Sequence, residues 1–224
     1  NSASALASIS AGMLSNPANP LSAFGMGMGP LAASALDVFA HATAHYGKPE
    51  FGIDSVEIDD KPHAVTQSVV MKRPFGDLLR FRVEGTPADR PRLLIVAPMS
   101  GHYATLLRGT VERMLESAEV FITDWADAKM VPLSHGTFHL DDYVEYVRKF
   151  IRHLGPAVHV VSVCQPTVPV LAAVSLMASA EEDIAPCSMI MMGGPIDARR
   201  SPTAVNDLAM RKPYSWFENH VIYS

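Results

Sequence analysis

Short apolar runs, most of them rich in β-branched residues, recur along the chain after residue 64 and predict strands. Residues 65–71 and 78–83 flank a turn-forming stretch, which indicates a hairpin. Residues 93–97 form a continuous apolar run, the pattern of a strand buried on both faces. Similar runs predict further strands over residues 120–123, 158–163 and 187–192.

Apolar residues three and four positions apart predict the helices. The clearest case is the stretch 141–154, where one apolar stripe ends at Gly155 and Pro156. Helices are also predicted over residues 104–117 and 168–180. A hairpin followed by alternating strands and helices indicates an α/β protein with a mostly parallel sheet. Ligands of such sheets bind outside the carboxyl ends of the strands.

The first 47 residues contain a single charged residue, Asp37, and are predicted to form helices broken by turns at residues 15–20 and 25–30. We expect a helical arm over residues 1–50, followed by an α/β core over residues 51–218. The arm either packs on the core or docks on something apolar. The residues that recur at helical spacing in its second half are Leu31, Ala35, Val38, Phe39 and Ala42.

Charge and cysteine content narrow the functional class. The chain has 224 residues, a formal net charge of −5, and 18 basic residues against 23 acidic ones. With no basic cluster, we expect no nucleic-acid partner. Two cysteines cannot form a disulfide framework, which favours a reducing, cytoplasmic compartment. No apolar run approaches the ~20 residues that span a bilayer, and the N-terminal stretch lacks the positive region of a secretory signal.

Metal and nucleotide sites are not expected. His135 and His139, like His41 and His45, are four positions apart, but neither pair has the Glu of a His-Glu-x-x-His motif. The sequence contains no Cys-x-x-Cys, and its glycine-rich stretches lack the phosphate-loop and dinucleotide fingerprints.

Cys164 is the strongest candidate for chemistry. It ends a predicted strand just before a helix that can begin near Pro166, which is where α/β hydrolases carry their nucleophile. Cysteine replaces the usual serine of Gly-x-Ser-x-Gly, and Ser162 and Pro166 replace the glycines. A helix N-terminus favours the thiolate, and the backbone N–H of Gln165 would face the developing oxyanion. The alternative is a buried cysteine with a packing role, the interpretation we give Cys187.

The loop over residues 97–103 is the candidate for the second half of an oxyanion hole. In hydrolases of this type, the loop after an earlier strand supplies the second N–H donor. Met99 or Ser100 is placed to donate it, and Gly101 would allow a close approach. The alternative is an ordinary strand–helix turn with Ser100 as the helix cap. His102 is a possible base, although a histidine here more often shapes the pocket.

Several strings together resemble the intracellular poly(3-hydroxybutyrate) depolymerases. They include the loop Ser100-Gly101-His102 and the elbow Val163-Cys164-Gln165-Pro166, and they lie in residues 46–49, 94–108, 122–125, 131–132, 138, 140–143, 163–166 and 192–197. The resemblance implies an α/β-hydrolase fold and a Cys–Asp–His triad with Cys164 as nucleophile. It further implies hydrolysis of stored polyester at cytoplasmic granules through a thioester acyl-enzyme, without a cofactor.

The chain departs from this family in one respect. The family's acid and histidine lie on later strands, beyond a cap segment that would start at about residues 219–224. We therefore expect this chain to be an N-terminal portion, incomplete at the C-terminus of the fold, whose triad partners lie on the remaining part of the same protein. Asp197 and His220 follow Cys164 in the order of a triad, but few strands remain to carry His220 back to the elbow.

Two other functions compete with ester hydrolysis. A polyester synthase also has a cysteine nucleophile, but it resembles Gly-x-Cys-x-Gly-Gly, which Gln165 and Pro166 do not fit. A non-catalytic granule-binding protein would use the uncharged N-terminal arm as its apolar docking surface.

Overall fold

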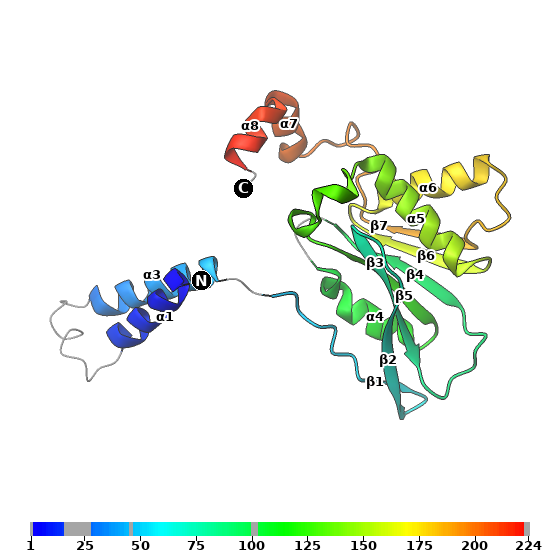
Figure 1. Cartoon of the computed structure of the whole chain (residues 1–224), viewed down its shortest axis with the longest axis horizontal. Helices are drawn as coiled ribbons and strands as arrows, with labels where there is room; N and C mark the ends of the chain where they lie inside the picture. The colour runs from blue at the N-terminus through cyan, green and yellow to red at the C-terminus, as the bar shows by residue number, and fades with distance from the viewer. Residues whose placement is uncertain (1, 16–27, 45–46, 100–102, 222–224) are drawn as a thin grey trace. The chain divides into compact units, whose positions relative to one another are not determined.

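The computed structural model describes residues 2–15, 28–44, 47–99 and 103–221. It consists of two compact units, one formed by Asn1–Pro49 and the other by Glu50–Ser224 (Figure 1). Each is described separately below. Within the described ranges, no helix combines the length and the apolar character needed to cross a bilayer.

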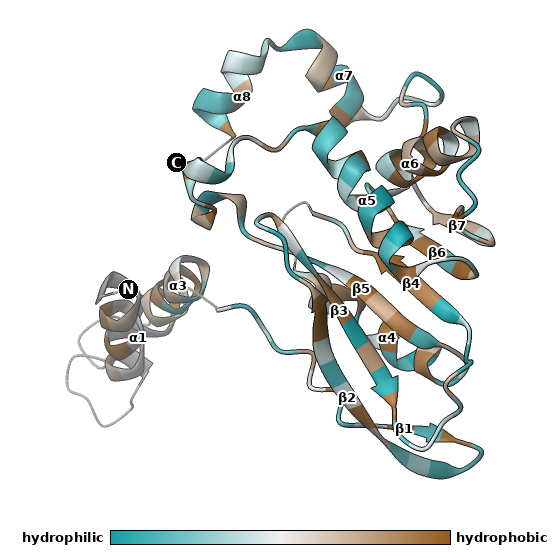
Figure 2. Ribbon diagram, turned by 45° about the vertical axis from the view of Figure 1, so that its right-hand side comes forward, coloured by the Kyte–Doolittle hydropathy of each residue, from teal (hydrophilic) through white to brown (hydrophobic). Residues whose placement is uncertain are grey.

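The first unit is a pair of helices packed against each other, α1 (Ser2–Ser15) and α3 (Met28–Thr43). The buried side chains on these helices are small: Ala7, Ala11, Ala33 and Ala40. The ribbon of both helices is largely in the hydrophobic colours (Figure 2). The large apolar side chains of the pair are exposed. They are Leu6, Ile9, Met13, Leu31, Val38 and Phe39. The apolar stripe that predicted the second helix is therefore largely exposed.

The second unit contains a seven-stranded sheet with the strand order β1-β2-β3-β5-β4-β6-β7. Its strands are β1 (Ser55–Ile58), β2 (Lys61–Met71), β3 (Gly76–Val83), β4 (Arg92–Val96), β5 (Glu119–Trp125), β6 (Val158–Val163) and β7 (Ser188–Met192). The pairs from β1 to β5 are antiparallel, and β5, β4, β6 and β7 run parallel. This mixed sheet, with helices on both faces, is an α/β-hydrolase fold.

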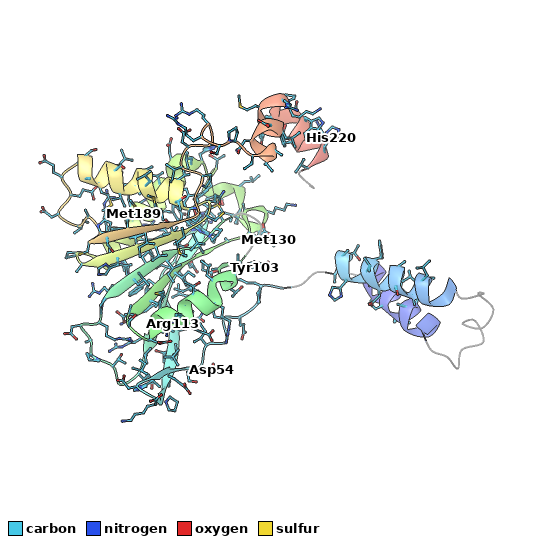
Figure 3. The ribbon with its side chains drawn as sticks, turned by 180° about the vertical axis from the view of Figure 1, so that it is seen from behind. Asp54, Tyr103, Arg113, Met130, Met189 and His220 are labelled. Carbon is cyan, nitrogen blue, oxygen red and sulfur yellow. The ribbon has the colours of Figure 1, made fainter. Side chains whose placement is uncertain are left out.

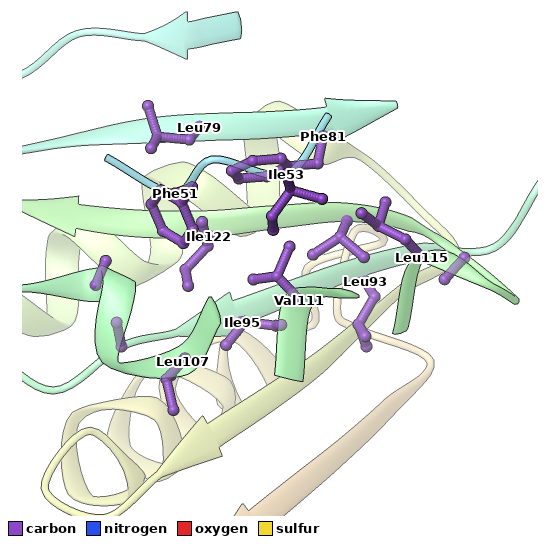
Figure 4. Close-up of a cluster of buried hydrophobic side chains, with 14 of the residues drawn as sticks. Phe51, Ile53, Leu79, Phe81, Leu93, Ile95, Leu107, Val111, Leu115 and Ile122 are labelled. Atoms are coloured by element: carbon purple, nitrogen blue, oxygen red, sulfur yellow. The ribbon is translucent and has the colours of Figure 1, made fainter. Parts of the chain in front are cut away.

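Two apolar clusters lie on opposite faces of the sheet. On one face, a 3₁₀ turn (Ala104–Leu107) and α4 (Arg108–Leu115) pack on strand residues (Figure 4). The labelled members of that cluster are Phe51, Ile53, Leu79, Phe81, Leu93, Ile95, Leu107, Val111, Leu115 and Ile122. On the other face, the stripe of α5 (Leu140–Leu154) and the buried side of α6 (Thr167–Ser179) cover the sheet. After β7 come α7 (Ala204–Arg211) and α8 (Tyr214–His220).

The structure confirms the strongly patterned elements and corrects one packing assignment. The strand predicted over 158–163 is β6 without change, and the helix predicted over 141–154 begins one residue earlier. The core role predicted for Cys187 is wrong, because this residue is exposed. It precedes β7, the outermost strand of the described sheet, whose Ile190 and Met192 are also exposed. The apolar run predicted the strand, but it could not show that the strand is outermost and has a sheet neighbour on one side only.

Candidate active site

The candidate site lies where β4 and β6 end. These parallel strands are neighbours, and Val96 pairs with Ser162 in their register. Ala97, the first residue after β4, and Cys164, the first residue after β6, therefore leave the sheet at the same edge. The loop that begins at Pro98 and the turn at Cys164 are thus brought side by side, as expected for ligand sites at the carboxyl ends of parallel strands.

Cys164 occupies a tight turn between β6 and α6. Its φ of 68° lies in the left-handed region, which non-glycine residues rarely adopt. Its own N–H donates to the Met192 carbonyl oxygen over 2.8 Å. Its carbonyl oxygen accepts from Thr167, over 3.2 Å from the backbone N–H and over 2.8 Å from Oγ1. The backbone is thus fixed on both sides of a side chain that is exposed.

Small or compact neighbours allow this turn. Ser162 is fully buried and its hydroxyl donates to the Ile190 carbonyl oxygen over 3.2 Å. Gly194, which follows β7, lies so close to Thr167 that an added Cβ would overlap Oγ1 and Cβ of that side chain and lie 2.5 Å from its Cγ2. Pro166 precedes the first residue of α6, where its missing N–H costs nothing.

The predicted oxyanion donors occupy different surroundings. Gln165 directly follows Cys164 and is exposed. Met99 is partly buried, and its side chain packs against the apolar cluster on the α5 face. Ser100 lies outside the described residues, as do Gly101 and His102. The structure therefore brings Met99 and Gln165 to the end of the same pair of strands, while their role as donors stays a prediction.

Sequence reasoning missed the group that anchors the start of this loop. The Ala97 carbonyl oxygen accepts from Trp125 Nε1 over 2.8 Å and from the Tyr143 hydroxyl over 3.4 Å. The Ala97 N–H donates to Thr123 Oγ1 over 2.9 Å. All four residues are buried. A Trp and a Thr at the end of β5 are weak signals, because nothing in the sequence shows that they meet the end of β4.

Asp197 and His220, the rival triad partners, are engaged locally. Asp197 accepts two hydrogen bonds from the Arg199 guanidinium, over 2.8 and 3.0 Å, which hold the pKa of that carboxyl below its usual value. His220 lies on α8 (Figure 3), where Nδ1 donates to the Trp216 carbonyl oxygen over 2.8 Å and the imidazole stacks on the indole. Among the described residues, no hydrogen bond joins either one to Cys164.

Metal chemistry has no support in the described part of the chain, where no three His, Cys, Asp or Glu side chains gather as a metal site. The group that the structure exposes at the end of β6 is the thiol of Cys164.

The family described as "PHB de-polymerase C-terminus" matches residues 193–224. This match supports a PHB depolymerase family for the chain. The matched stretch begins directly after β7 and includes Gly194, α7 and α8. No curated protein matches the chain.

Solved structures of similar arrangement include ester and lipid hydrolases. An ester hydrolase from the metagenome of Lake Arreo is 14% identical, with a TM-score of 0.49 over 87% of this chain and 62% of its own. A second α/β hydrolase from that metagenome is 15% identical, with a TM-score of 0.45, over 81% of this chain and 56% of its own. Brefeldin A esterase is 14% identical, with a TM-score of 0.39, over 70% of this chain and 45% of its own. The chain thus spans about half to three fifths of the length of these proteins.

Proposed function

We propose that the protein to which this chain belongs hydrolyses ester bonds of intracellular poly(3-hydroxybutyrate), with Cys164 as the nucleophile. The observation that carries the proposal is the left-handed, hydrogen-bonded turn that exposes Cys164 between β6 and α6. A nucleophile on a strained strand–helix turn is exposed at the edge of the sheet, within reach of a substrate. The match to the PHB depolymerase family supports a polyester as the substrate.

The reaction proceeds by two acyl transfers. Cys164 Sγ, as the thiolate, attacks the ester carbonyl carbon, and the backbone N–H groups of Gln165 and of Met99 or Ser100 stabilise the oxyanion. The intermediate expels the alkoxide of one polymer end, which takes up a proton, and leaves a thioester on Cys164. Water then attacks the thioester and releases the carboxylic acid and the thiol.

Both steps need a base for the thiol and for the attacking water. We assign this base and its acid to a histidine and an aspartate on the remaining C-terminal part of the same protein. The local engagement of Asp197 with Arg199 and of His220 with Trp216 supports this assignment.

The test of the chemistry is a burst experiment on the 224-residue chain. With p-nitrophenyl butyrate we expect at most one equivalent of p-nitrophenol per Cys164, followed by little steady turnover, because acylation survives without a base better than deacylation does. Cys164→Ala should remove the burst, and the control Cys187→Ala should keep it. A burst that survives Cys164→Ala would refute the nucleophile. Sustained turnover abolished by His220→Ala would instead support a Cys164–Asp197–His220 triad.

The exposed apolar surface of the α1–α3 pair favours a second role, docking on the granule. Leu31 is 66% exposed and Val38 is 69% exposed, while Asp37 is the only charged residue in the first 47. A surface without Lys or Arg suits an uncharged polyester better than an anionic lipid headgroup. This role accompanies catalysis, or replaces it if the chain is a non-catalytic granule-binding protein.

Docking is tested by sedimentation with amorphous poly(3-hydroxybutyrate) particles. We expect the double variant Leu31→Asp, Val38→Asp to stay in the supernatant while the wild-type chain sediments. Leu133→Asp is the matched control, because Leu133 is a 96% exposed leucine of the other unit. Equal loss of sedimentation in the control, or no loss in the double variant, would contradict docking through these helices.

A further inference from the structure

The candidate site contains a buried set of hydrogen bonds whose purpose the fold alone does not explain. Ala97 is the first residue after β4 and begins the predicted oxyanion loop, and the candidate donor Met99 follows two residues later. Its N–H and its carbonyl oxygen are both held by side chains from other elements, namely Thr123, Trp125 and Tyr143. Three side-chain hydrogen bonds on one backbone residue exceed what is needed to end a strand, since one partner satisfies each group.

We propose that Trp125 and Tyr143 are positioning residues that fix the oxyanion donor at Met99 by holding the Ala97 carbonyl. The inference rests on the proposed function, and it adds residues that do not touch the reacting atoms.

The argument starts from the torsions between Ala97 and Met99. The Ala97 carbonyl lies in the same planar peptide unit as the Pro98 nitrogen, so hydrogen bonds to this carbonyl orient that whole plane. The pyrrolidine ring then fixes φ of Pro98 near −65°. One soft torsion, ψ of Pro98, is left before the peptide unit that carries the Met99 N–H. The Met99 side chain restrains this torsion, because it packs against the cluster that contains Trp125 and Tyr143.

Trp125 and Tyr143, which donate to the Ala97 carbonyl oxygen, are themselves held firmly. Their rings meet edge to face, with centroids 4.6 Å apart, and both side chains are buried. Burial raises the pKa of the Tyr143 hydroxyl above its usual value, so this group stays protonated and can donate at any working pH. An added Cβ at Gly76 would lie 2.6 Å from Trp125 Cε3, so the strand β3 closes the other side of the indole. A preorganised donor needs such support, because small displacements of an oxyanion hole are costly.

The surrounding aromatic cluster offers a matched control. Tyr146 lies one turn further along α5, and its ring contacts Trp125 and Phe138. Its hydroxyl accepts from the Phe75 N–H over 3.4 Å and does not reach Ala97. Tyr143→Phe and Tyr146→Phe therefore remove the same atom from the same cluster, but only the first removes a donor to Ala97.

The experiment compares two reactions of the same thiol in the 224-residue chain. Acylation by p-nitrophenyl butyrate passes through an oxyanion, whereas alkylation by iodoacetamide does not. Alkylation is followed at Cys164 by peptide mapping, because Cys187 is also exposed, and under conditions in which each variant is fully folded. The burst rate divided by this alkylation rate therefore reports on the oxyanion donors and is insensitive to changes in thiol reactivity. We expect this ratio to fall about tenfold in Trp125→Phe and about threefold in Tyr143→Phe, whose hydrogen bond is the longer one. Tyr146→Phe should leave it within twofold of the wild type.

The outcomes separate this inference from the proposed function. If the wild-type chain gives a Cys164-dependent burst but the ratio is unchanged in Trp125→Phe and Tyr143→Phe, the positioning role is wrong and the nucleophile stands. An equal fall in Tyr146→Phe would also refute it, because the effect would then belong to the cluster and not to Ala97. If the wild-type chain gives no burst, the proposed function fails, and the positioning role fails with it.

Discussion

Gly194→Ala is the sharpest test of how the chain after β7 supports the candidate nucleophile. Gly194 lies against Thr167, the first residue of α6, whose side chain is fully buried. An added methyl group would fall 2.5 Å from Thr167 Cγ2 and closer still to Oγ1 and Cβ, far inside van der Waals contact. Thr167 cannot rotate away without breaking the hydrogen bond from its Oγ1 to the Cys164 carbonyl oxygen. The substitution should therefore displace either the β7–α7 connection or the elbow.

The expected loss of stability has two contributions, overpacking and a broken hydrogen bond. Overpacking a buried site costs about 1–3 kcal/mol, and the net loss of one buried hydrogen bond costs about 1 kcal/mol. Gly194→Ala should thus lower the free energy of unfolding by about 2–4 kcal/mol, a substantial part of the ~5–15 kcal/mol typical of a domain. With an m value of about 3 kcal/mol/M in urea, the midpoint should fall by about 1 M.

Urea unfolding followed by tryptophan fluorescence measures this shift, and iodoacetamide alkylation of Cys164 measures whether the elbow has moved. Gly109→Ala is the matched control, because Gly109 lies in α4 and a Cβ there meets nothing within 4 Å. It should leave the chain equally or slightly more stable, since alanine favours a helix by up to ~1 kcal/mol. If the urea midpoint of Gly194→Ala lies within about 0.1 M of the wild type (on the order of the measurement error) and Cys164 reacts at an unchanged rate, Gly194 does not lie in close contact with Thr167.

Three further outcomes follow from charged and thiol groups. Hydrogen bonds from Arg152 and Arg148 lower the pKa of Glu182 from 4.5 to about 2, so their stabilising effect is complete above pH 4.5 and declines toward pH 2. Glu182→Gln should therefore lower Tm at pH 7. A decrease in Tm that is undiminished at pH 2 would contradict this. Brief iodoacetamide labelling with peptide mapping should favour Cys164, at the N-terminus of α6, and preference for Cys187 would refute its role. No Cys164–Cys187 disulfide should appear on a non-reducing gel, because the β6–β7 register sets them ~20 Å apart.

The hydrophobic pattern of the sequence predicted those helices and strands whose pattern is complete within their own residues. The stripe of α5 and the β-branched run of β6 are each complete in their own sequence, and both were predicted within one residue. The elbow could also be anticipated, because a strand, a cysteine and a proline follow one another directly. Its left-handed φ fits this prediction.

Features that depend on distant neighbours escaped prediction. Thr123, Trp125 and Tyr143 lie 26, 28 and 46 positions from Ala97, so only the folded sheet brings them together. The exposure of Cys187 has the same origin, since an apolar run does not show whether its strand has one neighbour or two. The first helices show the limit most clearly. The alanines pack inside, and large residues such as Leu31 and Val38 face outward, a reversal that apolar periodicity alone cannot reveal.

The left-handed turn at Cys164 sets stability and function against each other. Holding a side chain with a Cβ at a φ of 68° costs about 1–3 kcal/mol, whereas glycine adopts this conformation freely. After the greater entropy that glycine gives the unfolded chain is subtracted, Cys164→Gly should still gain up to about 2 kcal/mol. A screen that selects variants for thermal tolerance alone would therefore enrich chains without the proposed nucleophile. Engineering of a more durable enzyme has to hold position 164 constant and seek its gains elsewhere.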